Sequence, residues 1–156
     1  YEGAKALANG EVTRAHYARY LVQIGKVSND GQAFKRYLGG GKSCFVKAEW
    51  VNIPTAIDTI HAAGGVAVIA HPMRYNMTGK WIRRLIIDFK QWGGDGMEVA
   101  DSGQTKDQRQ YLARLANEYD LAASLGSDFH FPCGWIELGK NLFLPEEVKP
   151  IWTLFE

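Results

Sequence analysis

Two of the four histidines closely follow short apolar runs that are typical of buried parallel strands. His71 comes directly after Val66–Ala70, and His130 comes shortly after Leu121–Leu125. In parallel α/β folds, functional groups gather in the loops at the carboxyl ends of the strands. Asp128 precedes His130 by two residues, so both side chains point the same way if this segment is extended. We therefore predict that His71, Asp128 and His130 are metal ligands.

The neighbouring residues suit such a site. Pro72 restricts the backbone just beyond His71 and should keep a helix from starting there. Gly126 should permit the close approach that a binding loop needs. Mixed histidine and aspartate ligands favour Mn²⁺, Zn²⁺ or Fe²⁺ over a cysteine-rich structural zinc site. The alternative is that each histidine is an ordinary hydrogen-bonded residue with no metal.

The elements that must position these residues alternate between helix and strand. The patterns predict strands at Val66–Ala70, Gly96–Ala100 and Leu121–Leu125, with helices at Pro54–Ala63, Lys80–Trp92, Lys106–Tyr119 and Glu146–Phe155. Ala56, Ile57 and Ile60 should form the buried face of the first of these helices. This alternation with short turns predicts an α/β fold with parallel strands, either an open sheet or a barrel.

The first third of the chain is expected to be helical instead. Thr13 can cap a helix that runs to about Ile24 and ends at Gly25. Asp30 should open a second short helix, which Gly39-Gly40-Gly41-Lys42 breaks.

Composition and charge narrow the class of protein. An apolar content of 46% and a charged content of 22% are ordinary for a globular protein and exclude intrinsic disorder. No apolar run approaches the ~20 residues that a membrane span needs. Residues 1–49 carry a net charge of +4 and residues 50–156 one of −3. A basic front suits phosphate attraction and an acidic back suits metal binding, although a solvated helical surface would show the same charges.

The cysteines and the first residues bear on where the protein works. Cys44 and Cys133 are far apart, so we expect free thiols and a cytoplasmic location rather than a disulfide. The chain starts at Tyr1 without a methionine or a leader sequence. We therefore expect a fragment whose amino-terminal part is missing. Three strands are too few to close a barrel, so that part, or a partner copy, should supply the rest.

Several motifs resemble the PHP (polymerase and histidinol phosphatase) superfamily of metal-dependent phosphoesterases. Ala70-His71-Pro72 and Gly126-Ser127-Asp128-Phe129-His130 are similar to two of its metal-binding motifs. Over essentially its whole length, the chain resembles the branch of bacterial 5′→3′ exoribonucleases and 3′,5′-nucleoside bisphosphate phosphatases. The segments that carry this likeness include Thr13–Arg19, Gly41-Lys42, Ala70–Asn76, Met97-Glu98-Val99 and Trp135–Gly139.

This resemblance implies the carboxyl-terminal part of a distorted (β/α)7 PHP barrel with a helical insertion. Residues 1–49 would be most of the insertion, and residues 50–156 the carboxyl-terminal portion of the barrel. His71, Asp128 and His130 would be part of a site for two or three ions, usually Mn²⁺, with Zn²⁺, Fe²⁺ or Mg²⁺ as alternatives. The family's other ligands precede Tyr1 in its motif order, so this chain alone should be incomplete and inactive.

The resemblance also gives the basic residues a role. Arg14, His16, Arg19 and Lys42 would face a substrate phosphate from the insertion, and Arg74 would do so from the loop after His71. Surface ion pairs are the alternative for each. Glu98 ends a strand on the side of the site, where it could support the metal ligands or be simply structural, and we favour the structural role. His61 is expected at the surface.

The expected activity is hydrolysis of RNA 5′ ends or nucleotides by a metal-bound hydroxide. No covalent nucleophile is needed. Two alternatives remain: a non-catalytic nucleic-acid-binding or regulatory remnant, and a small-molecule phosphatase of the histidinol phosphate type.

Overall fold

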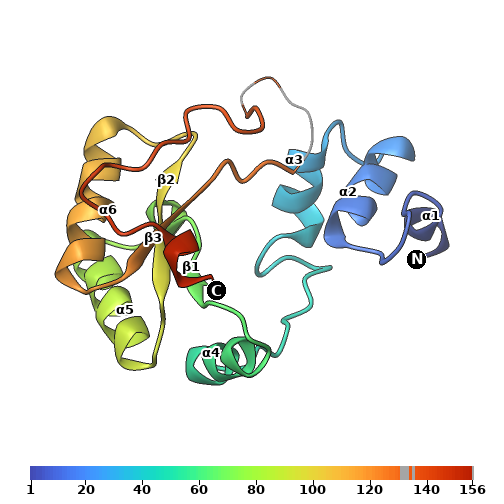
Figure 1. Ribbon diagram of the computed structural model, residues 1–156. Helices are drawn as coiled ribbons and strands as arrows, with labels where there is room; N and C mark the ends of the chain where they lie inside the picture. The colour runs from blue at the N-terminus through green and yellow to red at the C-terminus, as the bar shows by residue number, and fades with distance from the viewer. Residues whose placement is uncertain (131–133, 135, 156) are drawn as a thin grey trace. The chain divides into compact units, whose positions relative to one another are not determined.

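The computed structural model describes residues 1–130, 134 and 136–155 and forms two compact units, Tyr1–Trp50 and Val51–Glu156 (Figure 1). Cys44 in the first unit is an exposed free thiol. Cys133 and Trp135 lie outside the described residues. Among the described helices, none combines the length and the apolar character that a membrane crossing requires.

The first unit is helical, as its sequence predicts. It contains α1 (Glu2–Lys5), α2 (Arg14–Gln23), α3 (Asp30–Ala33) and a π-helical turn, η1 (Phe34–Leu38). Thr13 precedes α2 as its N-cap, and Gly25 follows it with a positive φ of 70°. The small core consists of Ala18, Val27, Ala33 and Leu38. The short helix α1 was not predicted.

The second unit contains a three-stranded parallel sheet in the order β1-β2-β3. Its strands are β1 (Val68–Ile69), β2 (Gly96–Asp101) and β3 (Ala122–Gly126). Its helices are α4 (Ile53–Ala62), α5 (Gly79–Gln91) and α6 (Lys106–Glu118), with 3₁₀ turns at η2 (Pro72–Arg74) and η3 (Ile151–Leu154). The prediction of an α/β fold with parallel strands is therefore confirmed.

Side-chain caps begin two of these helices where the sequence places polar residues. Asn52 accepts a hydrogen bond from the Thr55 amide at 2.9 Å at the start of α4. Thr105 does the same for the Gln108 amide at 3.2 Å at the start of α6. Each cap satisfies an amide that has no partner within its helix, which stabilises the helix by about 1 kcal/mol.

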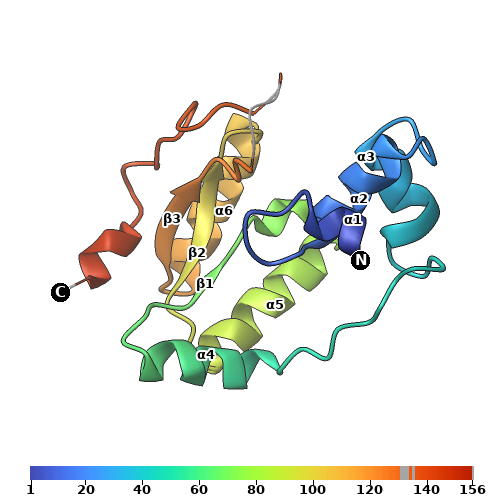
Figure 2. The same cartoon turned by 90° about the vertical axis from the view of Figure 1, so that its right-hand side faces the viewer.

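Helices α5 and α6 lie on the same side of the sheet (Figure 1). Figure 2 shows α6 running alongside β2 and β3. The connections β1-α5-β2 and β2-α6-β3 proceed in the same direction across the sheet, so crossovers of the same hand place both helices on one side. The core between the layers includes Ile82 and Ile86 of α5, Met97 and Val99 of β2, and Leu112 and Leu115 of α6.

Two predictions about the helices α4 and η3 of this unit are wrong. The helix expected at Glu146–Phe155 is only the turn η3, because Pro150 disfavours a helical residue before it and is itself extended. The Lys149 carbonyl instead accepts a hydrogen bond from the Ala123 amide of β3 at 2.7 Å. Ile60 was expected in the buried face of α4, yet it is 38% exposed, since α4 buries Ile57 but not the next turn.

Candidate metal and phosphate site

The predicted ligands lie in loops that leave the same edge of the sheet. His71 follows β1, and Asp128 and His130 follow β3. Because all three strands are parallel, their carboxyl ends meet at one edge. The His130 Nδ1 and Asp128 Oδ1 atoms are 3.8 Å apart. Arg74, three residues after His71, forms an ion pair with Asp128 and so joins the two loops.

Two of these residues have unusual backbone conformations. His71 has φ 33° and ψ 55°, and Asp128 has φ 54°, which places both in the left-handed region. This region disfavours residues with a Cβ atom and costs of order 1–3 kcal/mol for a strained position. Such strain persists where surrounding structure enforces it, often at functional sites. Asp128 is therefore not in the extended segment that we predicted.

The turn after His71 also differs from the prediction. Pro72 was expected to keep a helix from starting, but it is the first residue of η2. Proline is tolerated at this position because its missing N–H would have no partner within the helix anyway. The Arg74 amide donates to the His71 carbonyl at 2.9 Å and closes the turn. As a result, η2 directs Arg74 back toward the edge of the sheet.

Glu98 of β2 supports the strained backbone of His71. The Glu98 Oε2 atom accepts a hydrogen bond from the His71 amide at 2.6 Å, and Glu98 is only 8% exposed. Burial raises the pKa of Glu98, while the hydrogen bond from His71 opposes that rise. A Cβ atom at position 126 would lie 2.6 Å from the Glu98 Oε1 atom, so Gly126 does allow a close approach. Glu98 thus holds the backbone of a predicted ligand, which is the alternative to the simply structural role that we favoured.

An irregularity in β2 directs two acidic side chains to this edge. The pairing with β3 slips between Glu98 and Ala100, so one residue of β2 is extra. In a regular strand, Glu98 and Asp101 would point to opposite faces because they are three residues apart. A bulge shifts this alternation by one residue. Both carboxylates consequently contact the loop after β1.

Asp101 is a site residue that our sequence reasoning missed. Its side chain is 3% exposed, and its Oδ2 atom lies 2.6 Å from the Arg74 Nη2 atom. The Gly103 amide donates to its Oδ1 atom at 2.7 Å. Arg74 therefore spans the carboxylates of Asp101 and Asp128. The position of Asp101 at the end of a strand is the signal that could have identified it, by the same reasoning that identified His71.

The donor atoms fit a metal ion in part. The His71 Nδ1 atom is buried without a hydrogen-bond partner, which suits a ligand atom. The His130 Nδ1 atom lies 2.7 Å from the Asp128 carbonyl, which leaves its Nε2 atom for other interactions. In the described part of the chain, no group of three or more His, Cys, Asp or Glu side chains is arranged to hold a metal ion. The assignment of the three ligands thus stays a prediction.

A pocket of about 190 Å³ adjoins this site and is lined by His71, Met73, Arg74, Asp101, Gly103, Gln104 and Gln108. The Gln104 Oε1 atom accepts a hydrogen bond from the Asp101 amide at 3.0 Å. This bond fixes the orientation of the side-chain amide. The Gln104 Nε2 atom is buried and has no hydrogen-bond partner among the described residues.

The other predicted phosphate-binding residues belong to the first unit. Arg14 and His16 lie in the first turn of α2, Arg19 is exposed on the same helix, and Lys42 is exposed after η1. The His16 Nδ1 atom accepts a hydrogen bond from the Thr13 amide at 3.0 Å, so His16 caps the helix. A role for these four residues in phosphate binding stays a prediction.

The chain is similar to curated bacterial phosphoesterases over nearly its whole length. It is 80% identical to a 5′-3′ exoribonuclease of Haemophilus influenzae over 99% of this chain and 57% of that protein. It is 51% identical to the 5′-3′ exoribonuclease Rnm of Escherichia coli, over 99% of this chain and 53% of that protein. A 3′,5′-nucleoside bisphosphate phosphatase of Chromobacterium violaceum is 42% identical over 93% of this chain and 51% of its own length.

The chain also matches solved structures of bacterial proteins. An amidohydrolase of Chromobacterium violaceum, with bound sulfate and no metal, matches with a TM-score of 0.82 and 40% identity over 97% of this chain and 54% of its own. A proposed metal-dependent phosphoesterase of Bifidobacterium adolescentis matches with a TM-score of 0.74 and 27% identity, over 99% of this chain and 56% of its own. No family model matches the chain.

These comparisons confirm the predicted resemblance to the exoribonuclease and bisphosphate phosphatase branch. The chain spans about half the length of the curated relatives that it matches.

Proposed function

We propose that the chain is part of a metal-dependent phosphoester hydrolase that acts on RNA 5′ ends or on nucleotides. The observation that carries the proposal is the whole-chain similarity to exoribonucleases, which reaches 80% identity. The similarity to a 3′,5′-nucleoside bisphosphate phosphatase supports phosphorylated nucleotides as the wider substrate class. A cytoplasmic location is part of the same proposal.

In this proposal, His71, Asp128 and His130 contribute three ligands to a site for two or three ions, with Mn²⁺ as the preferred metal and Zn²⁺, Fe²⁺ or Mg²⁺ as alternatives. The metal, when bound, would activate water and neutralise charge on the leaving oxygen. The orphaned Nδ1 atom of His71 supports the assignment, as does the strained backbone of His71 and Asp128.

The remaining residues would bind and orient the phosphate. Arg74 is anchored by the buried Asp101 carboxylate and can present its guanidinium N–H groups to phosphate oxygens. Glu98 holds the His71 backbone through its amide and thereby orients a ligand. Arg14, His16, Arg19 and Lys42 would attract the phosphate from the helical insertion at 1–49.

We further propose that residues 50–156 form the carboxyl-terminal portion of a distorted (β/α)7 barrel. The parallel sheet with α5 and α6 on one side is the arrangement that a β/α barrel repeats around its axis. The missing strands and ligands would come from a longer polypeptide, as the length of the relatives suggests. The chain alone would then bind metal weakly and show no turnover.

A non-catalytic nucleic-acid-binding or regulatory role is the second candidate. It is favoured by the lack of a ready-made three-ligand metal group in the described part of the chain. The full reading frame separates the two candidates. Some of the other metal ligands of the resembled PHP superfamily lie in a His-x-His motif. Such a motif upstream of Tyr1 supports the enzyme, whereas its absence there supports the regulatory role.

The decisive experiment is an assay of the full-length protein with Mn²⁺. We expect several equivalents of transition metal by elemental analysis, together with hydrolysis of 5′-phosphorylated RNA, of a 3′,5′-nucleoside bisphosphate, or of both. Histidinol phosphate serves as the competing small substrate. A full-length protein that has no bound metal after growth in manganese, and that hydrolyses none of these substrates, would contradict the proposal. Robust turnover by residues 1–156 alone would contradict the claim that further ligands are needed.

A further inference from the structure

An exposed aromatic ring lies close to the candidate site but has no part in the function proposed so far. Phe143 is 60% exposed, although an aromatic side chain of this size is normally buried. The Arg109 guanidinium carbon lies 3.9 Å from the centre of its ring. This distance is that of a close cation–π contact, which holds the ring in place.

Arg109 itself is firmly anchored. The residue is 4% exposed, and its Nη2 atom donates to the Asn141 carbonyl at 3.0 Å and to the Asp101 carbonyl at 3.4 Å. Burial lowers the pKa of Arg109, and the nearby Asp101 carboxylate opposes this shift. Phe143 therefore lies on a fixed cationic support and presents an aromatic surface to solvent.

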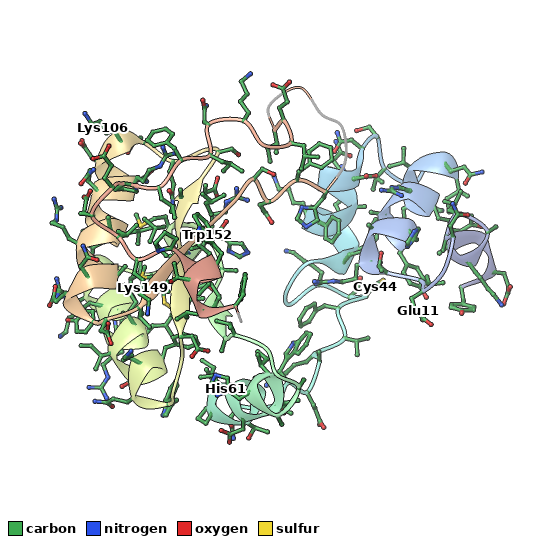
Figure 3. The ribbon with its side chains drawn as sticks, in the orientation of Figure 1. Glu11, Cys44, His61, Lys106, Lys149 and Trp152 are labelled. Atoms are coloured by element: carbon green, nitrogen blue, oxygen red, sulfur yellow. The ribbon has the colours of Figure 1, made fainter. Side chains whose placement is uncertain are left out.

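A pocket beside this ring shares a lining residue with the pocket at the candidate site. Its volume is about 240 Å³, and Phe143, Arg109, Lys106 and Gln104 are among its lining residues. Gln104 also lines the pocket that contains His71 and Arg74, so the two pockets are adjacent. The Gln104 Nε2 atom is buried and has no hydrogen-bond partner among the described residues. Lys106 extends from the start of α6 (Figure 3).

We propose that Phe143 is a stacking platform for a base of single-stranded RNA, one or more nucleotides to the 3′ side of the cleaved bond. The inference rests on the proposed function, because it places the reacting phosphate beside His71 and Arg74. Lys106 binds a backbone phosphate of the same RNA segment. Exposed aromatic rings beside cations are the usual means of binding single strands without reading their sequence.

The platform distinguishes RNA from a mononucleotide. A nucleoside bisphosphate is too short to contact both the reacting site and a second stacked base. An oligoribonucleotide gains the stacking contact, which is worth roughly 5- to 150-fold in affinity for each base. The enzyme's preference for RNA over bisphosphate would thus depend on Phe143.

The test measures binding to the full-length protein in EDTA, with a fluorescent 5′-phosphorylated oligoribonucleotide and with a 3′,5′-nucleoside bisphosphate as probes. For Phe143→Ala we expect the ratio of RNA affinity to bisphosphate affinity to fall by about 5- to 150-fold. Phe143→Trp keeps an aromatic surface and should restore the ratio. Phe155→Ala is the matched control, because Phe155 is 62% exposed and follows η3 away from these pockets.

A second variant tests the phosphate contact. Lys106→Ala should weaken RNA binding regardless of sequence and reduce the slope of log affinity against log salt by about 0.7, the value for one phosphate contact on a single strand. An unchanged salt slope would remove Lys106 from the RNA path.

The outcomes separate this inference from the proposed function. Equal losses for RNA and bisphosphate, or an unchanged ratio in Phe143→Ala, overturn the platform even if the enzyme hydrolyses both substrates. A full-length protein that does not bind RNA overturns it as well. If Phe143→Ala lowers the ratio of RNA affinity to bisphosphate affinity but the protein has no hydrolytic activity, the result supports the stacking platform and contradicts the proposed hydrolase activity.

Discussion

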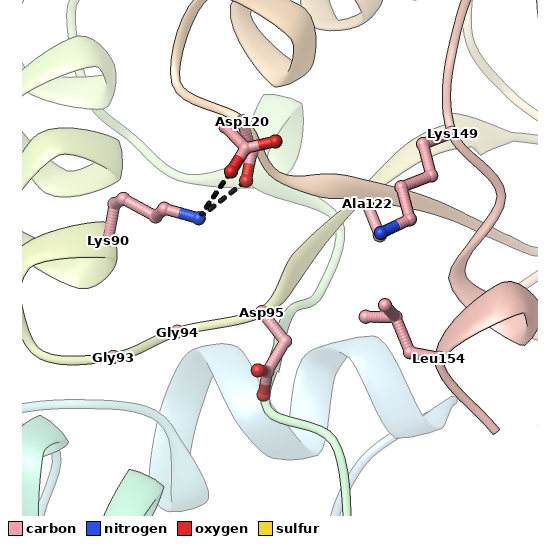
Figure 4. A pocket seen from close by; sticks show the side chains of 8 residues that line it. All are labelled: Lys90, Gly93, Gly94, Asp95, Asp120, Ala122, Lys149 and Leu154. Atoms are coloured by element: carbon pink, nitrogen blue, oxygen red, sulfur yellow. Dashed lines mark hydrogen bonds and ion pairs between the residues drawn. The ribbon is translucent and has the colours of Figure 1, made fainter. Parts of the chain in front are cut away.

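The two edges of the sheet in Val51–Glu156 differ in how completely their buried polar side chains are paired. At the amino ends of the strands, charges are paired with nearby partners. The Asp95 Oδ2 atom accepts hydrogen bonds from His61 Nε2 and from the Ala67 amide, both at 2.7 Å. Lys90 donates to the Asp120 carbonyl at 2.6 Å, across a pocket that Lys149 also lines (Figure 4). His61 is 39% exposed, in agreement with the surface position that we predicted.

At the carboxyl ends, polar groups are left without partners. His71 Nδ1, Gln104 Nε2 and Arg109 Nε are the buried side-chain atoms that lack a hydrogen bond among the described residues, and all three lie toward this edge. Buried polar atoms normally find partners, so such a concentration needs an explanation. The amino edge is built for stability, whereas the carboxyl edge keeps unpartnered polar atoms that a ligand can use.

One pair of residues makes the comparison directly. Asp120 at the amino edge and Asp128 at the carboxyl edge share a left-handed backbone, with φ of 50° and 54°. The Asp120 side chain is 95% exposed, while that of Asp128 is 26% exposed and contacts Arg74. Two aspartates with the same backbone conformation thus have different environments at the two edges.

The largest effect is expected for Asp128→Asn in the full-length protein. Asparagine tolerates the left-handed backbone, so the fold should remain while a carboxylate ligand is lost. We expect activity to fall by about 100-fold or more, since even outer partners of metal ligands contribute roughly 10- to 100-fold. Elemental analysis should show less metal. Asp120→Asn makes the same change at the amino edge, and full metal content in Asp128→Asn would contradict the ligand assignment.

A glycine tests the packing of the amino edge. A Cβ atom at Gly96 would lie 2.7 Å from the Ala122 carbonyl oxygen and 2.5 Å from Ile151 Cδ1. Because the carbonyl is backbone and cannot move freely, Gly96→Ala should destabilise the protein by about 1–3 kcal/mol in urea denaturation. Gly79→Ala is the control, since its nearest neighbour would be 3.5 Å away. Equal stability of the two variants would show that this edge is loosely packed.

The strain at His71 predicts a smaller effect. His71→Gly and His71→Ala both remove the imidazole, but only glycine adopts a φ of 33° without a steric cost. We expect His71→Gly to unfold with a free energy about 1 kcal/mol higher than His71→Ala, despite the usual entropic disadvantage of glycine. Greater stability of the alanine variant would mean that the loop relaxes and stores no strain.

The smallest effect concerns a surface cluster at the carboxyl end of α6. Hydrogen bonding with Tyr119, and then with Arg83, lowers the pKa of Glu118. A lowered folded-state pKa contributes stability in neutral solution, and this contribution is lost as the pH falls through that pKa. Glu118→Gln should therefore lower Tm slightly at pH 7 and not in strongly acidic buffer. Exposed Glu146→Gln is the control, and a Tm difference for Glu118→Gln that persists in acid would contradict this account.

The order of helices and strands could be predicted from the sequence alone. Periodic apolar residues, Thr13 and Gly25 at the ends of α2, and the glycines between α5 and β2 are local signals that do not depend on the rest of the fold. The same signals located His71, Asp128 and His130 after strands. They failed at Glu146–Phe155, where pairing with β3 and Pro150 outweighed helical periodicity.

The detailed geometry of the site was decided only by the tertiary structure. The bulge in β2 brings Glu98 and Asp101 to one edge, and no local pattern announces it, because it depends on the register with β3. The left-handed turns of His71 and Asp128 likewise depend on contacts with Glu98 and Arg74 from other segments. Residue types and their order along the chain therefore determined which groups reach the sheet edge, whereas long-range pairing determined how those groups face one another there.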